Sequence, residues 1–313
     1  MITRPKLSTL VASLVVAVAG MGSAHALTIT SGNYKISFDN YDSGTTGYGN
    51  FAPGTFTQVC TTVAGCDAVA GISKAPGSVG SVNTSADTMG IISVSNITNV
   101  TTGATEYIKG TTSTVGGVVF GPYLTGVFGN LTDANVLVSC PPGGGACTTD
   151  ARSISGQFRL WSNTADYNPT FGPAVSAGVD LNNARYTGIN PGGALFLSGN
   201  FAAGGAVAGD SATTYASTFN NNSISGLGFG ALDFTGGSAL SFFNTNSYTN
   251  VNGGLNDAYL TASFNPSSAA ANWTVISTGQ VIGAVSVPEP GSLLLASLAL
   301  LGMGAVTRRV VKR

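Results

Sequence analysis

The sequence predicts an all-β protein: a single antiparallel β-sandwich or jelly-roll-like domain, flanked by an N-terminal signal helix and a C-terminal transmembrane helix. Glycine supplies 44 of the 313 residues and charged residues only 8%, so much of the polar surface must be Ser, Thr and Asn. These residues are unfavourable inside helices and suit turns between short strands. Regularly placed Phe, Tyr, Val and Ile argue for a packed core rather than a disordered chain.

Candidate strands recur throughout the body of the chain, residues 27–286. The stretch Ile154–Trp161 alternates apolar residues with polar ones such as Gln157 and Arg159, as a strand with one buried face does. Glycine-rich clusters such as residues 190–193 (NPGG) indicate turns, and many short strands joined in this way favour a sandwich. A β-solenoid is the alternative, although no fixed repeat supports it. The candidate strands are Tyr34–Phe38, Ile91–Val94, Val115–Leu124, Val136–Ser139, Ile154–Trp161, Ala194–Phe201, Ala239–Phe243, Tyr259–Phe264 and Trp273–Ile282.

Two further expectations concern organisation. Residues 203–230 have the weakest pattern and are expected to form long loops. No proline-rich or charged linker divides the body, so one domain is expected instead of two.

The N-terminus has the three parts of a secretory signal peptide. Arg4 and Lys6 form a basic region, an apolar stretch follows to about residue 20, and Ala24 and Ala26 frame an A-x-A cleavage site. The spacing predicts a signal peptide over residues 1–26 and a mature chain that begins at Leu27.

The C-terminus combines a stiff tetrapeptide, an uncharged apolar segment and a basic cluster. Two prolines restrict the backbone of the tetrapeptide, which keeps it extended and accessible. The apolar segment, residues 291–307, is at the short end of what spans a bilayer, and the basic tail 308–313 would stay in the cytoplasm. The tetrapeptide is Val287, Pro288, Glu289 and Pro290, and the basic residues are Arg308, Arg309, Lys312 and Arg313.

These three parts together resemble the PEP-CTERM sorting domain of exported proteins in Gram-negative bacteria. The resemblance covers only residues 287–313 and says nothing about the body. It implies cleavage near Pro288–Pro290 by an exosortase, a transient stay in the inner membrane, and delivery to the cell surface or to an extracellular matrix of polysaccharide. An ordinary single-pass tail anchor is the alternative interpretation.

Four cysteines form two close pairs, Cys60 with Cys66 and Cys140 with Cys147. In an oxidising compartment, close pairs of this kind are typical of disulfides that each close a small loop. A zinc site is the alternative. It lacks the usual ligand spacing and a histidine ligand.

Charge and histidine content exclude several functions. Residues 27–286 carry six basic and twelve acidic side chains, a net charge of −6 (6 minus 12), and no basic patch for nucleic acid. The only histidine, His25, lies in the predicted signal peptide, so triads and dyads that use histidine are excluded. The remaining enzyme class is a glycosidase that uses two carboxylates, for which Glu106 and the scattered Asp residues are the candidates.

Two local patterns suggest binding. Asp39 and Asp42 lie in FDNYDSGTTGYG, where crowded oxygen atoms would suit Ca²⁺, although Asx-rich turns without metal are common. Trp161, Tyr167 and Phe171 lie among Asn and Asp residues that would suit a sugar ring, although a tryptophan at the end of a strand more often packs into the core. No other cofactor is expected.

We therefore expect a non-enzymatic surface or matrix protein that is processed by an exosortase. The family resemblance implies a structural or adhesive role in extracellular polysaccharide, biofilm or floc. The alternatives are a carbohydrate-active enzyme with a carboxylate pair, and a sugar- or calcium-binding module without catalysis.

Overall fold

The computed structural model describes residues 32–43, 51–68, 88–115, 118–172, 181–182, 186–221, 223, 225–266, 273 and 275–285. These residues belong to one compact unit that begins at Ser31, and strands predominate among them. The predicted all-β class is therefore confirmed. None of the helices in this part of the chain is long and apolar enough to span a bilayer, and the predicted signal and transmembrane helices lie outside it.

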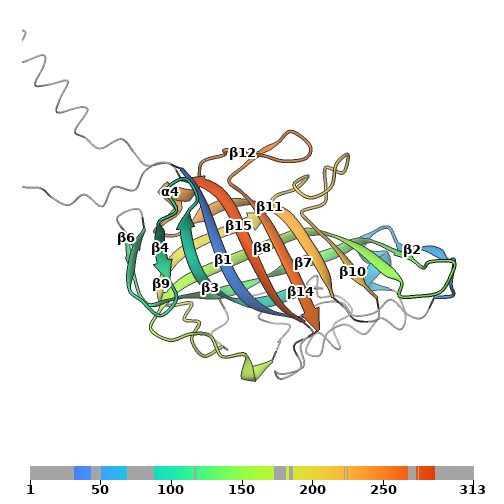
Figure 1. Cartoon of the computed structure of the whole chain (residues 1–313), viewed down its shortest axis with the longest axis horizontal. Helices are drawn as coiled ribbons and strands as arrows, with labels where there is room; N and C mark the ends of the chain where they lie inside the picture. Colours follow the sequence, from blue (N-terminus) through green and yellow to red (C-terminus); the bar gives the residue numbers. More distant parts are fainter. Residues whose placement is uncertain are drawn as a thin grey trace, which may run out of the picture. The chain divides into compact units, whose positions relative to one another are not determined.

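The main sheet closes into a barrel (Figure 1). Its eight strands are β1 (Gly32–Ser43), β3 (Thr88–Asn99), β7 (Tyr123–Ser139), β8 (Thr148–Asn163), β9 (Ala194–Phe201), β11 (Gly226–Gly236), β14 (Ala258–Pro266) and β15 (Val275–Val285). They are antiparallel in the order β8, β9, β11, β14, β15, β1, β3 and β7, and β7 pairs with β8 to complete the ring. The predicted sandwich is corrected to a barrel. Closure satisfies backbone groups that the edge strands of two separate sheets would leave unpaired.

Strands β9 and β10 (Tyr215–Asn220) fill the same position in the ring, one beyond the other. Both strands lie between β8 and β11. β9 pairs with the second half of β8 and the second half of β11, and β10 pairs with the first half of each. Glycines on β11 make room for the aromatic rings of β10: a Cβ at Gly228 would lie 1.7 Å from the Tyr215 hydroxyl, and one at Gly226 would lie 2.6 Å from the Cβ of Phe219. The loop predicted over residues 203–230 is correct for residues 203–214 and wrong beyond them, where β10 and the start of β11 lie.

Aromatic side chains fill one end of the barrel. The rings of Phe120 and Phe196 lie 4.8 Å apart edge to face, and Phe243 contacts Tyr34, Phe196 and Phe234 at centroid distances of 6.0–6.2 Å. Edge-to-face pairs add to the stabilisation that burial of the rings provides. The apolar alternation of the predicted strands therefore corresponds to residues that point into the barrel.

A short helix, α4 (Leu240–Phe243), closes this end, and its chain is held by a buried carboxylate. Asp257 accepts hydrogen bonds from the backbone N–H groups of Phe234, Thr245 and Asn246 at 2.6–2.8 Å. The predicted strand Ala239–Phe243 is therefore wrong. A short, mainly apolar segment does not distinguish a strand from a helical turn by its periodicity. In this helical turn the Phe243 side chain packs into the end of the barrel.

The hairpin of β7 and β8 continues beyond the barrel and forms a small extension with β2 (Phe56–Cys60) and α2 (Val63–Asp67). Both predicted disulfides are confirmed there: the Cα atoms of Cys60 and Cys66 are 5.1 Å apart, and those of Cys140 and Cys147 are 4.2 Å apart. The cysteines pack with Val136, Val138 and neighbouring barrel residues in a second core.

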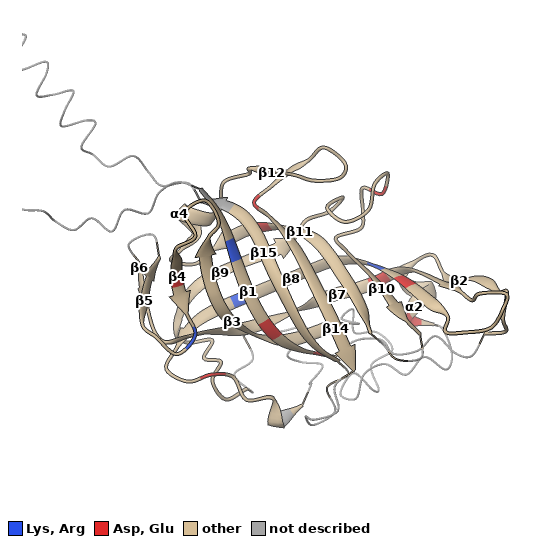
Figure 2. Ribbon diagram, viewed as in Figure 1, with Lys and Arg blue, Asp and Glu red and all other residues tan. Residues whose placement is uncertain are grey.

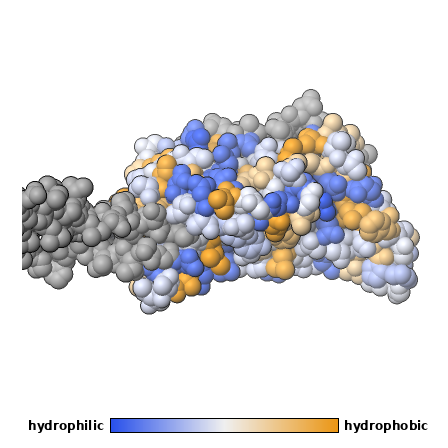
Figure 3. All heavy atoms as spheres, turned by 90° about the horizontal axis from the view of Figure 1, so that it is seen from above, coloured by the Kyte–Doolittle hydropathy of each residue, from blue (hydrophilic) through white to orange (hydrophobic). Residues whose placement is uncertain are grey.

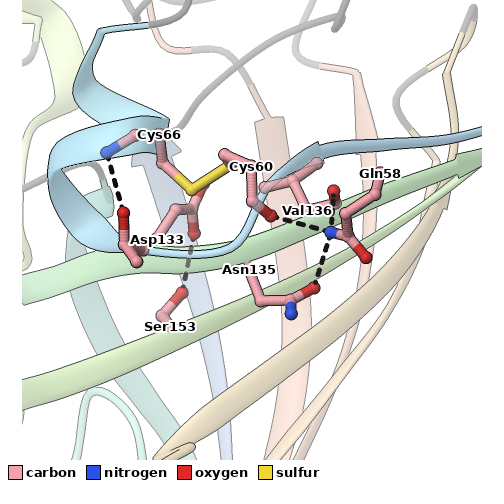
Figure 4. The surroundings of a disulfide bond; sticks show 9 residues. Gln58, Cys60, Cys66, Asp133, Asn135, Val136 and Ser153 are labelled. Carbon is pink, nitrogen blue, oxygen red and sulfur yellow. Dashed lines mark hydrogen bonds between the residues drawn. A yellow bond between two sulfur atoms is a disulfide. The ribbon is translucent and has the colours of Figure 1, made fainter.

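Polar contacts hold β2 on the hairpin (Figure 4). The Gln58 amide donates to the carbonyl oxygens of Cys60 and Val136, both at 2.7 Å, and to Asn135 Oδ1 at 3.2 Å. Nearby, Ser153 donates a 2.9 Å hydrogen bond to the buried Asp133 carboxylate. The single strand β2 is thus fixed by side-chain as well as backbone hydrogen bonds.

The remaining elements are short. The predicted strand Val115–Leu124 is divided, because Pro122 has no backbone donor and Gly121 approaches Asn163 closely: a Cβ there would lie 2.8 Å from the Asn163 carbonyl oxygen. The short elements are β4 (Thr105–Ile108), β5 (Ser113–Val115), β6 (Val118–Phe120), β12 (Tyr248–Thr249), β13 (Leu255–Asn256) and the 3-10 helix η1 (Pro169–Phe171).

Candidate functional site

The barrel interior is a packed core. Its cavity has a volume of about 80 Å³ and is lined mainly by apolar residues such as Phe128, Phe158 and Leu260. For comparison, an engineered cavity that binds benzene in a protein core has a volume of about 150 Å³. This cavity is therefore too small for a ligand of ordinary size, and the larger grooves among the described residues lie on the outer surface.

One carboxylate stands at the edge of this core. Asp42 lines the cavity and accepts hydrogen bonds from the Ser277 hydroxyl at 3.0 Å and from the Asn40 amide. Burial raises the pKa of Asp42 to about 7, and the two hydrogen bonds offset part of that effect. Asp42 is therefore a structural group of the barrel interior.

The two calcium candidates do not lie in a turn. Asp39 and Asp42 both lie on β1, three residues apart, so their side chains lie on opposite faces of the sheet. Among the described residues no group of three or more acidic or cysteine side chains could hold a metal ion. The structure therefore does not bring Asp39 and Asp42 together as ligands of one ion.

The aromatic segment around Trp161 builds a core outside the barrel wall. Trp161 is 2% exposed and packs with Tyr186 and Trp273 under the chain that follows β8. Tyr167 contacts Tyr41 at a ring distance of 5.8 Å. Asp166 secures the same chain: it accepts hydrogen bonds from Ser93 at 2.7 Å and from Lys109 at 2.9 Å. The interpretation of Trp161 as a core residue is thus confirmed.

The other predicted site residues are placed apart from one another. Glu106 lies on the short strand β4, with Tyr107 beside it in the core. The signal cleavage residues Ala24 and Ala26, the motif 287–290 and the basic tail 308–313 lie outside the described residues. Their roles stay predictions.

The outer face of β11, β14, β15 and β1 carries a groove of about 440 Å³ that the sequence did not reveal. We call it the β14 groove. Its residues are Ser37, Leu227, Gly228, Phe229, Tyr259, Thr261, Ala262, Ser263, Thr278, Gly279 and Gln280. The volume is within the range of about 300–1,000 Å³ that ligand pockets have.

Strand register arranges the groove in rows. Phe229 is paired with Thr261, Thr261 with Gln280, and Gln280 with Ser37. These four outward side chains form one line across four strands, about 4.8 Å apart. The line therefore offers an aromatic ring followed by hydroxyl, amide and hydroxyl groups.

Tyr259 stands in the neighbouring row and has its orientation fixed. Its ring stacks on Tyr248 of β12 with centroids 5.3 Å apart and planes at 27°. On the other side of the line, the Ser263 and Thr278 hydroxyls lie 3.3 Å apart, beside Leu227, which is 62% exposed. The groove thus combines two partly exposed aromatic rings with five hydroxyl or amide side chains.

No charged side chain lines the β14 groove. Lys35 and Asp39, in the rows on either side of Ser37 on β1, are of opposite sign. Figure 2 shows that charged residues on the barrel strands are few. The face seen in Figure 3 likewise mixes hydrophilic and hydrophobic residues in small patches. The groove is therefore suited to an uncharged polar ligand.

Comparison with known proteins supports the C-terminal prediction. The PEP-CTERM protein-sorting motif matches residues 286–309, and this motif indicates export and sorting to the cell surface or the extracellular space. The motif implies that an exosortase processes the chain. No curated protein and no solved structure matches the chain.

Proposed function

We propose that the protein is a non-enzymatic surface or matrix protein that binds uncharged polysaccharide through the β14 groove. The sorting motif delivers the barrel to the place where such polymers lie. The observation that carries the proposal is the line of Phe229, Thr261, Gln280 and Ser37 across four strands, next to the fixed ring of Tyr259.

Sugar chemistry fits this arrangement. A sugar ring has an apolar face of C–H groups and a rim of hydroxyls. Aromatic rings pack against the face, and Ser, Thr and Gln both donate to and accept from the hydroxyls. An anionic polysaccharide would instead require Arg or Lys in the groove.

The acidic residues support a role without catalysis. Most of the described ones bind structural partners: Asp257 holds backbone N–H groups, Asp166 binds Lys109, and Asp210 binds Arg152 at 3.3 Å. A glycosidase needs two carboxyl groups on either side of the bond that it cleaves, and the lining of the β14 groove contains none.

Retention on immobilised polysaccharides tests the proposal. The exported chain is passed over uncharged glucans, mannans and galactans and over a uronate-rich polymer. We expect retention on at least one uncharged polymer, with little change between low and high salt because no charges are involved. Tyr259→Ala should weaken binding about tenfold or more, which corresponds to about 1.4 kcal/mol.

Phe56→Ala is the matched control, because Phe56 is an aromatic residue that is 73% exposed and lies outside the groove. It should bind as the wild type does. Retention on the uronate polymer alone, or release of reducing ends from any polymer, would refute the proposal.

A further inference from the structure

A second groove of about 460 Å³ lies on the outer surface where β7, β8 and β9 meet. We call it the β8 groove. It is lined by Asn130, Thr132, Ser155, Gly156, Gln157, Asn200 and Phe201. It is as large as the β14 groove and, like it, contains no charged side chain.

Left-handed backbone creates the depression. Asn130 and Ser155 have φ angles of 58° and 63°, and Gly156 has 104°. Asn130 lies opposite Gly156, between the pairs Gly129–Gln157 and Leu131–Ser155. The left-handed residues of β7 and β8 are therefore next to each other across the sheet. A Cβ at Gly156 would lie 2.6 Å from Leu131 and 2.8 Å from Phe201, so glycine is required here.

The groove presents amide and hydroxyl groups to solvent. Gln157 and Asn200 are paired across β8 and β9, and both are exposed, as is Ser155. Phe201, the one aromatic residue in the lining, is only 8% exposed. The β8 groove thus has the hydrogen-bonding groups of the β14 groove and lacks its aromatic platform.

The two grooves lie on opposite sides of the barrel. The β14 groove is centred on β14 and β15, and the β8 groove is centred on β8. In the closed order, β9 and β11 separate β8 from β14 on one side, and β7, β3 and β1 separate it from β15 on the other. In Figure 1 β14, β15 and β1 cross in front of β7 and β8.

We infer that the β8 groove is a second site for uncharged polysaccharide, and that one molecule bridges two polymer chains. The inference rests on the proposed function of the β14 groove. Because the sites face away from each other, a single stiff chain does not reach both, and double occupancy joins separate chains. Even weak binding at each site then gives a strong network, because each bridge raises the local concentration of the next site.

Stoichiometry and clustering test the inference together. The probe is the uncharged polysaccharide that the exported chain retains best, used intact and as a short oligosaccharide prepared from it. Calorimetry with the oligosaccharide should show two sites per chain, and light scattering with the intact polymer should show clusters. The double variant Gln157→Ala/Asn200→Ala should keep one site and lose at least about tenfold in scattering, with an unchanged melting temperature.

Tyr259→Ala should also keep one site, now the β8 groove, and Asn33→Ala, an exposed amide outside both grooves, should change nothing. One site per chain in the wild type would overturn the inference and leave the proposed function intact. Clustering that survives in the double variant would overturn it as well. If no uncharged polymer is retained, both the proposed function of the β14 groove and the inference for the β8 groove are refuted.

Discussion

The barrel and the disulfide-closed extension are built from the same two strands but are stabilised by different means. In the barrel, β7 and β8 have sheet neighbours throughout the ring and an aromatic core inside it. In the extension, the same hairpin pairs with β2 and β10, and its core combines the four cysteines with Val136, Val138, Phe219 and Phe264. Three short strand segments and one short helix bury too little apolar surface to be stable alone. Disulfides therefore add to the packing in the part of the sheet that extends beyond the ring.

The largest effect should come from emptying the barrel core. Phe196 is 1% exposed and contacts Phe120 and Phe243. Phe196→Ala should lower the free energy of unfolding by about 3–5 kcal/mol, the range for a buried aromatic residue. Thermal unfolding measures the loss. Phe56→Ala, an exposed residue of the extension, should stay within about 0.5 kcal/mol, and equal losses in both variants would contradict the comparison.

The free energy of unfolding should depend on pH because of Asp42. Its pKa is raised from 3.8 to about 7, so the folded state binds the proton more tightly than the unfolded state does. The contribution of Asp42 to stability is therefore present in full below about pH 4 and is lost as the pH rises to about 7. Because the side chain is not fully secluded, we expect the loss to be about 2–4 kcal/mol.

Unfolding of the wild type and of Asp42→Asn, measured from pH 4 to pH 8, isolates this contribution. The difference between the two curves should change with pH in that window and be constant above it. A constant difference at all pH values would show that the Asp42 carboxyl titrates normally.

Removing the disulfides should affect the extension alone. For loops of about seven residues, each disulfide contributes about 2–2.5 kcal/mol by restricting the unfolded chain. In the Cys60→Ser/Cys66→Ser variant, the backbone amides of β2 and α2 should lose protection from hydrogen exchange, while those of β14 and β15 keep it. Parallel loss in β14 and β15 would mean that the extension and the barrel unfold as one unit through Phe219, Phe264 and Val275.

The smallest effect concerns the helix of the extension. The Thr62 hydroxyl accepts a hydrogen bond from the Gly65 N–H at 3.1 Å and caps α2. Thr62→Ala should cost about 1 kcal/mol, seen as faster exchange of the α2 amides. The matched change Thr57→Ala on β2 removes a hydroxyl but no cap, and it should leave α2 unchanged.

Local patterns predicted the strands well where side chains alternate. The predicted strand Ala194–Phe201 coincides with β9, and Ile154–Trp161 lies within β8. The pattern failed in the first half of β11, where glycines occupy the inward positions beside β10, so large apolar residues mark the buried face only in the second half of that strand. Ala239–Phe243 failed because a short apolar run suits a strand and a helical turn equally well.

Closure of the barrel and formation of the grooves depend on pairing between strands that are far apart in the sequence, which a local sequence pattern does not predict. β1 pairs with β15, and Ser37 meets Gln280 across 243 residues of chain (280 minus 37). The line of Phe229, Thr261, Gln280 and Ser37 becomes visible only once three registers are known. The cysteine pairs, by contrast, were predictable, because a disulfide between residues six or seven apart needs no knowledge of the fold.

The pairing of the first and last barrel strands also determines when the barrel can close during export. Gly32 lies opposite Val285, and the sorting motif begins at residue 286. During N-to-C translocation, β14 and β1 lack their common neighbour until β15 has crossed the membrane, so the ring stays open until residue 285 has passed. The last residue of β15 and the first residue of the sorting motif are thus joined by one peptide bond.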